Sequence, residues 1–171
     1  MNEHTPDCCF ATDKNWFRYR TAALIVEEGE VLFIKSTSFD YLYTVGGGVH
    51  MGESSVECVK REVLEETGVP YEIDRLAVVV ENFFTGEGSL EGKDCHVIEF
   101  YYLMKSRGKK DAVCKSLGWD NAKESIYWVP LEKLKDTNVK PSFLCTRMKE
   151  ILESKSILHV ITEADRKNKA T

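Results

Sequence analysis

Nine residues between Gly47 and Val69 stand at a spacing that could gather carboxylates around a hard metal ion. The 23-residue segment reads G-x5-E-x7-R-E-V-L-E-E-T-G-V. Its fixed positions are Gly47, Glu53, Arg61, Glu62, Val63, Glu65, Glu66, Gly68 and Val69. A loop followed by a helix would bring its four carboxylates and one guanidinium to one place. Because a hard divalent cation prefers oxygen ligands of this kind, the pattern indicates a candidate cation site.

A helix is expected to start at Ser54 and to run to Thr67. Ser54 and Glu57 form the S-x-x-E pattern of a capping box, in which the two residues satisfy each other's backbone donors. Gly68 is a natural C-terminal stop, and Pro70 lies just beyond it. The second half of the metal-binding pattern should therefore be helical.

Three glutamates of this helix share one face, because Glu62, Glu65 and Glu66 are three and four residues apart. Arg61 lies at the edge of that face, one turn before Glu65. The other side can be buried; it carries Val56, Val59, Val63 and Thr67. Most charge runs on helices are simply solvated, so a solvated acidic face and a bound cation are both open readings at this point.

A glycine-rich loop precedes the helix and ends at Glu53. It comprises Gly46, Gly47, Gly48, Val49, His50, Met51 and Gly52. Glycine lets backbone carbonyls and amides approach a ligand closely. We therefore expect this loop to border the same site as the helix glutamates.

The pattern resembles the box of the Nudix hydrolases at every fixed position. The resemblance also covers the stretches Phe17–Val26, His96–Leu103 and Trp128–Leu134. One departure is Val45, which stands where the family often has a proline, and it touches no ligand. The resemblance implies an α/β fold, the Nudix α/β/α sandwich with a mixed sheet between helices. It also implies hydrolysis of a nucleoside diphosphate linked to another group.

The same resemblance implies which residues would act. Its metal ligands carry over to the carboxylates of Glu62, Glu65 and Glu66 and the carbonyl of Gly46, with Glu53 assisting. The metal would be Mg²⁺ or Mn²⁺, which oxygen ligands favour over softer ions. Arg61 would orient a carboxylate, a task that suits a planar guanidinium. The catalytic set is then Glu62, Arg61, Glu65 and Glu66.

The general base is open among four glutamates. Glu62 is the first choice, and Glu99, Glu87 and Glu91 are the alternatives outside the box. Alternation along a strand places Glu99 on the face opposite its two apolar neighbours, so we also count it as a candidate metal ligand. A solvated outer face would explain that position equally well.

Substrate contacts are expected from the loop and from nearby polar and aromatic residues. The candidates are Gly47, Gly48, Arg20, Tyr43, Phe84 and His96. A nucleobase needs an apolar or aromatic cleft, and Phe39, Tyr41 and Phe83 also surround the box in sequence. Similar hydrolases of ADP-ribose carry a proline shortly past the box, and those of dinucleoside polyphosphates a tyrosine. Since Phe83 and Phe84 stand near that place, we favour a nucleoside triphosphate or a nucleotide sugar.

The remaining chain predicts one domain of residues 14–163 between a flexible tail, 1–13, and a frayed tail, 164–171. Its strands are expected at Phe17–Val26, Val31–Lys35, Tyr41–Val45, Tyr71–Phe84, Cys95–Lys105, Ser125–Val129 and Leu158–Thr162. A second helix is expected at Pro141–Ser154, and the polar stretch Ser106–Glu124 is read as a connection. The six cysteines form no C-x2-C pair, so we expect free thiols.

Bulk properties narrow the function further. The net charge of −5 argues against electrostatic binding of long nucleic acid. No apolar run approaches the length of a membrane span, and no signal-peptide core is present, so a cytoplasmic location is expected. The alternatives are a non-catalytic nucleotide-sensing Nudix module and an RNA 5′-end pyrophosphohydrolase. Similar proteins are often dimers, which makes a homodimer an option.

Overall fold

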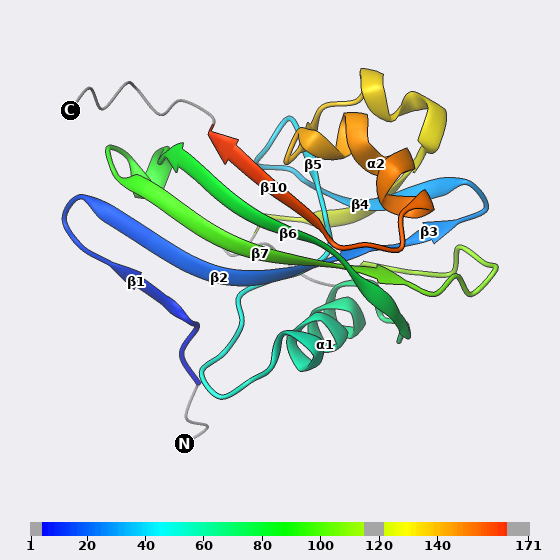
Figure 1. Ribbon diagram of the computed structural model, residues 1–171, viewed down its shortest axis with the longest axis horizontal. Coiled ribbons are helices and arrows are strands. Elements are labelled where there is room, and N and C mark those ends of the chain that lie inside the picture. Colours follow the sequence, from blue (N-terminus) through cyan, green and yellow to red (C-terminus); the bar gives the residue numbers. More distant parts are fainter. Residues whose placement is uncertain (1–4, 115–121, 164–171) are drawn as a thin grey trace.

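The computed structural model describes residues 5–114 and 122–163, and two α-helices lie on opposite sides of its β-sheets (Figure 1). The strands are β1 (Cys9–Ala11), β2 (Asn15–Leu24), β3 (Val26–Glu27), β4 (Glu30–Ser36), β5 (Leu42–Tyr43), β6 (Ile73–Thr85), β7 (Asp94–Met104), β8 (Glu124–Pro130), β9 (Val139–Lys140) and β10 (Leu158–Glu163). The helices are α1 (Ser55–Thr67) and α2 (Phe143–Glu153), with short 3-10 helices η1 (Gly88–Leu90) and η2 (Leu131–Asp136). This is the α/β architecture that the sequence predicts.

The strands form two sheets where one mixed sheet was expected. The first has the order β1-β2-β7-β6-β10, and the second has the order β3-β4-β5-β9 with β8 paired to β4. The first is mixed, because β2 and β7 are parallel and β6 and β7 are antiparallel. The strand expected at Phe17–Val26 is divided between the sheets, since β2 ends at Leu24 and β3 begins at Val26.

Alternate residues at the end of β2 enter two different cores. Ala22 and Leu24 pack in the cluster that contains the apolar residues of α2. Ala23 and Ile25 pack in the cluster that contains Val59 and the other buried valine of α1. Because successive side chains of a strand point to opposite faces, β2 serves both layers of the sandwich.

The caps of α1 are confirmed as predicted. The Ser54 hydroxyl accepts from the Glu57 N–H (3.3 Å), and the Glu57 carboxylate accepts from the Ser54 N–H (2.9 Å). At the other end Gly68 adopts the left-handed region, with φ of 68°, and its N–H donates to the carbonyl of Leu64 (2.9 Å). These local contacts stop the helix where the box pattern stops.

The prediction of a loose tail over residues 1–13 is wrong for its described part. Cys9 pairs with Arg18 in the antiparallel contact of β1 with β2, and the Cys8 N–H donates to the carbonyl of Val49 (2.7 Å). The rings of Phe10 and Phe17 stack with their centroids 5.3 Å apart. A three-residue strand is too short for periodicity to reveal, so this pairing has no clear sequence signal.

The buried carboxylate of Glu27 holds the start of the expected polar connection in place. Glu27 is fully buried and accepts hydrogen bonds from the Ser106 hydroxyl (2.6 Å) and from the N–H groups of Arg107 (2.7 Å) and Gly108 (2.8 Å). Burial opposes the charge of Glu27, but these hydrogen bonds outweigh it and lower its pKa. Residues 115–121 of the connection lie outside the described residues.

Replacing Glu27 by glutamine is expected to lower the free energy of unfolding by about 1–3 kcal/mol, because the amide turns a donor toward groups that need an acceptor. The matched control is Glu72→Gln, which removes an exposed partner of Lys105 and should cost far less. Urea unfolding of both variants measures the difference, and equal midpoints would contradict the role given to Glu27.

The stability that Glu27 supplies should also depend on pH. Since its pKa is lower in the folded chain, that stability is fully present above the ordinary glutamate pKa of about 4.3. It is lost as the pH falls through the lowered value. The gap between wild type and Glu27→Gln should therefore shrink in acid.

All six cysteines are free thiols in the structure, as the sequence predicts. Within residues 5–114 and 122–163, no helix has the length and apolar character needed to cross a membrane.

Candidate active site

One guanidinium holds three of the box carboxylates. Arg61 donates from Nε and Nη2 to the two oxygens of Glu53, at 2.9 Å and 3.0 Å. Its Nη1 donates to Glu62 (2.7 Å) and to Glu65 (3.3 Å), and Nη2 also reaches the carbonyl of Gly48 (3.3 Å). We call Arg61, Glu53, Glu62 and Glu65 the Arg61 cluster. Its geometry needs the planar fork of arginine, which a lysine does not provide.

The cluster sets the charge states of its members. The hydrogen bond from Arg61 lowers the pKa of Glu53 to about 2, and the same bond raises the pKa of Arg61. Burial acts in the opposite direction on Glu62 and raises its pKa, although Arg61 partly offsets the effect. Glu53 is therefore a fixed anion, whereas Glu62 is a carboxylate whose charge is costly where it lies.

Glu66 occupies the most enclosed position of the box glutamates. Its carboxylate accepts the N–H of Gly46 (2.9 Å). Burial raises the pKa of Glu66 to about 8, while the Gly46 hydrogen bond opposes the rise and the charges of Glu62 and Glu124 add to it. A cation bound here would lower the pKa again, because it favours the charged form.

The glycine loop packs closely against β2 and Glu62 because Gly46 and Gly47 have no side chains. Gly46 has a φ of 140°, and a Cβ on it would lie 2.2 Å from the carbonyl oxygen of Thr21. A Cβ on Gly47 would lie 2.3 Å from an oxygen of Glu62. The loop backbone therefore approaches Glu62 and Glu66 as closely as packing allows.

The donor set suits a hard divalent cation. Within the two described ranges, no three Asp, Glu, His or Cys side chains stand close enough to one another to enclose a metal ion as they are placed. Arg61 and the Gly46 amide draw the carboxylates instead. The oxygens that would hold Mg²⁺ or Mn²⁺ are the carboxylates of Glu62, Glu65 and Glu66 and the carbonyl of Gly46, and they are of the type these ions prefer.

Two residues outside the box reach this site. Arg20 donates to the carbonyl of Gly46 (3.4 Å), and its Nε lies 3.8 Å from Glu99. Glu99 is 3% exposed and accepts from Tyr101 (2.8 Å) and Asn82 (3.2 Å). A solvated outer face is thus the wrong explanation for Glu99, although alternation had placed it correctly opposite its apolar neighbours.

The structure does not bring every predicted residue to the box. His96 alternates with Glu99 to the other face of β7, where its ring stacks on Phe83 at 4.3 Å between centroids. This placement argues against its expected phosphate contact. Phe84, by its register opposite Cys95, shares the face of Glu99. The two alternative bases in the loop between β6 and β7 are exposed; they are Glu87 and Glu91.

A cluster of aromatic rings stands where the chain enters the glycine loop. The rings of Phe39 and Tyr41 stack at 5.0 Å, and Tyr43 meets them edge-on at 6.5 Å and 6.3 Å. The Tyr43 hydroxyl donates to Glu124 (2.6 Å). Sequence reasoning missed Glu124, whose charge reaches Glu66, because only the pairing of β8 with β4 brings it near the box.

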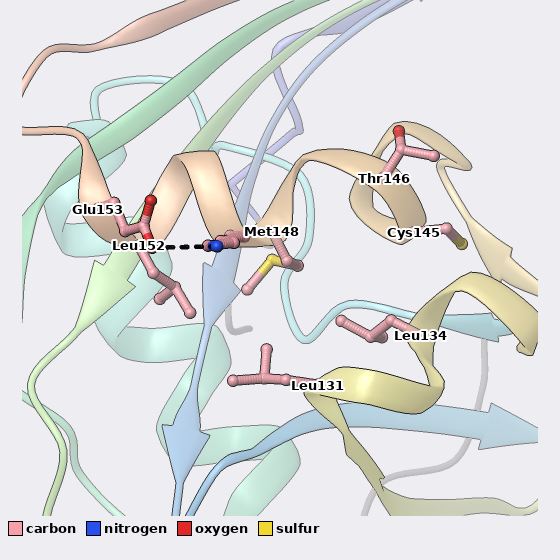
Figure 2. A pocket seen from close by; sticks show the side chains of 8 residues that line it. Leu131, Leu134, Cys145, Thr146, Met148, Leu152 and Glu153 are labelled. Carbon is pink, nitrogen blue, oxygen red and sulfur yellow. Dashed lines mark ion pairs between the residues drawn. The ribbon is translucent and has the colours of Figure 1, made fainter.

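A separate hollow lies between α2 and η2, on the α2 side of the sandwich (Figure 2). Its lining is mainly apolar and includes Leu131, Leu134, Cys145, Met148 and Leu152, with Glu153 at the rim. None of the box residues lines it. The hollow is therefore separate from the Arg61 cluster and the glycine loop.

The carboxylates of α1 and the glycine loop before it form one acidic site in an α/β/α sandwich. The family model described as NUDIX domain matches residues 16–147, so this chain belongs to the Nudix family, whose members are hydrolases that act on pyrophosphate bonds.

Solved structures agree on the fold. A MutT protein from Methanosarcina mazei Go1 is 24% identical, with a TM-score of 0.62 over 84% of this chain and 100% of that one. A mutator MutT protein from Bacillus halodurans is 20% identical, with a TM-score of 0.62 over 83% of this chain and 86% of that one. A UDP-X diphosphatase is 16% identical, with a TM-score of 0.56 over 88% of this chain and 69% of that one.

Proposed function

We propose that this hydrolase uses Mg²⁺ or Mn²⁺ to cleave the pyrophosphate bond of a nucleoside diphosphate linked to another group. The observation that carries the proposal is the Arg61 cluster, in which Glu53, Glu62 and Glu65 are all held by Arg61 beside the glycine loop. The bound metal would neutralise phosphate oxygens and activate the attacking water. Phosphorus chemistry needs both, because its substrate is anionic and water is a weak nucleophile.

The protein groups have separate tasks in this proposal. Arg61 keeps Glu53 charged and orients Glu62 and Glu65 toward the loop. Glu62 is the first candidate for the general base, since Arg61 holds its carboxylate (2.7 Å) directly against the backbone of Gly47. Glu66 and the Gly46 carbonyl complete the oxygen set, and the Gly46 N–H keeps Glu66 in place.

For the substrate we favour a nucleoside triphosphate or a nucleotide sugar. The aromatic rings of Phe39, Tyr41 and Tyr43 could receive a base, and Tyr43 donates to Glu124, whose charge reaches Glu66. Among the solved neighbours, the UDP-X diphosphatase is named for a substrate in which UDP is linked to another group. The cytoplasmic location and the homodimer stay predictions.

Two properties of the sequence make the alternative functions, a sensing module and an RNA 5′-end hydrolase, weaker. A sensing module usually loses box carboxylates, and this chain keeps all four. An RNA 5′-end hydrolase would be expected to carry a basic surface, whereas the net charge here is −5. Pyrophosphate release from a 5′-triphosphorylated oligomer, at the rate seen with free nucleotides, would restore the RNA reading.

Removing the divalent metal is expected to abolish turnover. The assay separates the nucleotide products by ion-exchange chromatography, with Mg²⁺, with and without EDTA, over nucleoside triphosphates (oxidised ones included), nucleotide sugars, ADP-ribose and dinucleoside polyphosphates. Hydrolysis of one class that EDTA stops and excess Mg²⁺ restores would support the proposal and name the substrate. Folded protein that binds Mn²⁺ yet hydrolyses none of them would favour the sensing module.

A further inference from the structure

A buried polar network crosses the first sheet beside the glycine loop. Both oxygens of Glu99 accept hydrogen bonds, one from Asn82 Nδ2 (3.2 Å) and the other from the Tyr101 hydroxyl (2.8 Å). The Thr162 hydroxyl on the neighbouring strand donates in turn to the side-chain amide oxygen, Oδ1, of Asn82. The side chain of Glu99 is 4% exposed. The network therefore locks the Glu99 carboxylate in one orientation.

Arg20 joins this network to the glycine loop. It is paired with Glu99 across the parallel contact of β2 and β7, and its Nε lies 3.8 Å from that carboxylate. Its Nη2 donates to the Gly46 carbonyl (3.4 Å). The buried Nε makes no hydrogen bond within the described part of the chain, so this guanidinium is only partly satisfied.

The charges around Arg20 explain why it stays a cation. Burial acts against its charge, but Glu99 and, further away, Glu66 and Glu62 outweigh burial and raise its pKa. Arg20 thus places a permanent positive charge between the Glu99 network and the loop. A guanidinium in such a place is suited to bind phosphate oxygens in pairs.

Resting on the proposed function, we infer that Arg20 binds a non-bridging phosphate oxygen of the substrate and that Glu99 is a positioning residue which aims Arg20. This replaces the expected metal-ligand role of Glu99. The Arg20 guanidinium already balances the charge of Glu99, and both Glu99 oxygens accept hydrogen bonds from neighbouring residues of the first sheet.

The test separates metal binding from nucleotide binding in Arg20→Gln, Glu99→Gln and the double variant. Mn²⁺ affinity is measured by electron paramagnetic resonance without nucleotide. Nucleotide affinity is then measured by calorimetry in saturating Mn²⁺, with the tightest wild-type binder among ADP, GDP, CDP and UDP. The control is Arg18→Gln, because Arg18 lies on the same face of β2 but pairs with Asp7.

We expect all variants to bind Mn²⁺ within about twofold of wild type. Arg20→Gln and Glu99→Gln should each weaken nucleotide binding about tenfold or more, equivalent to about 1.4 kcal/mol. The double variant should be no weaker than Arg20→Gln, because Glu99 acts only through Arg20. Arg18→Gln should change neither affinity, and Arg20→Lys should restore only part of the loss.

Two results would overturn the inference. One is a loss of about tenfold or more in Mn²⁺ affinity for Glu99→Gln, with Arg20→Gln unchanged in that assay, which would make Glu99 a metal ligand. The other is additive loss of nucleotide affinity in the double variant. If Glu99→Gln alone fails to fold, the double variant removes both buried charges, and Tyr101→Phe removes one Glu99 donor; its nucleotide affinity should fall while its Mn²⁺ affinity holds.

Failure of the proposed function would look different. Wild-type protein that binds Mn²⁺ and a nucleotide but hydrolyses nothing in the panel would remove the activity. The binding measurements on Arg20 and Glu99 would still decide how the phosphate is held.

Discussion

Glu66→Gln is expected to lower kcat by at least about a hundredfold, a cost of about 2.7 kcal/mol in the transition state. Glutamine keeps an acceptor for the Gly46 N–H, so the loop is retained while the negative charge is lost. Glu65→Gln should act in the same direction, because it removes another oxygen ligand of the proposed metal. Turnover in saturating Mg²⁺ measures both variants.

A gain in stability should accompany the loss of turnover in Glu66→Gln. Since burial raises the pKa of Glu66 to about 8, the metal-free wild type loses stability as the pH rises from the ordinary glutamate pKa toward that value. The amide has no such dependence. At pH 8 without metal, the variant should therefore unfold at a urea concentration no lower than wild type.

The control for this pair is Glu150→Gln, which removes an exposed carboxylate from α2, where it pairs with Arg147. It should leave kcat unchanged. If Glu65→Gln and Glu66→Gln both keep wild-type turnover, the assignment of the site to α1 is wrong. If turnover falls only because the variants unfold, the urea midpoints will show it.

Gly46→Ala is expected to remove activity and to lower the free energy of unfolding by about 3 kcal/mol or more. Two effects combine here: a φ of 140° that an L side chain rarely adopts, and a Cβ placed 2.2 Å from the backbone of Thr21. Because the backbone cannot yield as a side chain would, the loop must move. The Gly46 N–H would then leave Glu66, and the Gly46 carbonyl would leave Arg20.

A matched control separates the two effects. Gly52 also has a positive φ, of 84°, but a Cβ there would meet nothing within 4 Å. Gly52→Ala should therefore cost only about 1–2 kcal/mol from backbone strain and should keep its activity. Urea unfolding and metal-dependent hydrolysis of the substrate measure both variants, and similar losses in the two would show that the clash at Gly46 is absorbed.

What could be predicted from the sequence is what depends on neighbours along the chain. The start of α1 at Ser54, its end at Gly68 and the shared face of its glutamates all follow from spacings of three and four residues. The family pattern covers the same segment. For this reason the bounds of α1 and the family were predicted correctly.

What could not be predicted depends on pairing between distant segments. Glu124 reaches the neighbourhood of Glu66 only because β8 pairs with β4, and Arg20 meets Glu99 only through the register of β2 and β7. Neither register can be read from local periodicity. The stacking of His96 on Phe83 follows from the register of β6 and β7 in the same way.

The division of β2 between two cores limits where this chain can change length. Deleting or inserting one residue just before Ala22 would turn the residues on one side of the change to the opposite face, so that either Ala23 and Ile25 turn toward α2 or Arg20 leaves the loop. Either the two cores or the charged network would be lost. Natural or engineered insertions should therefore gather in the connections between strands, whereas β2 should keep its length and vary only in residue type.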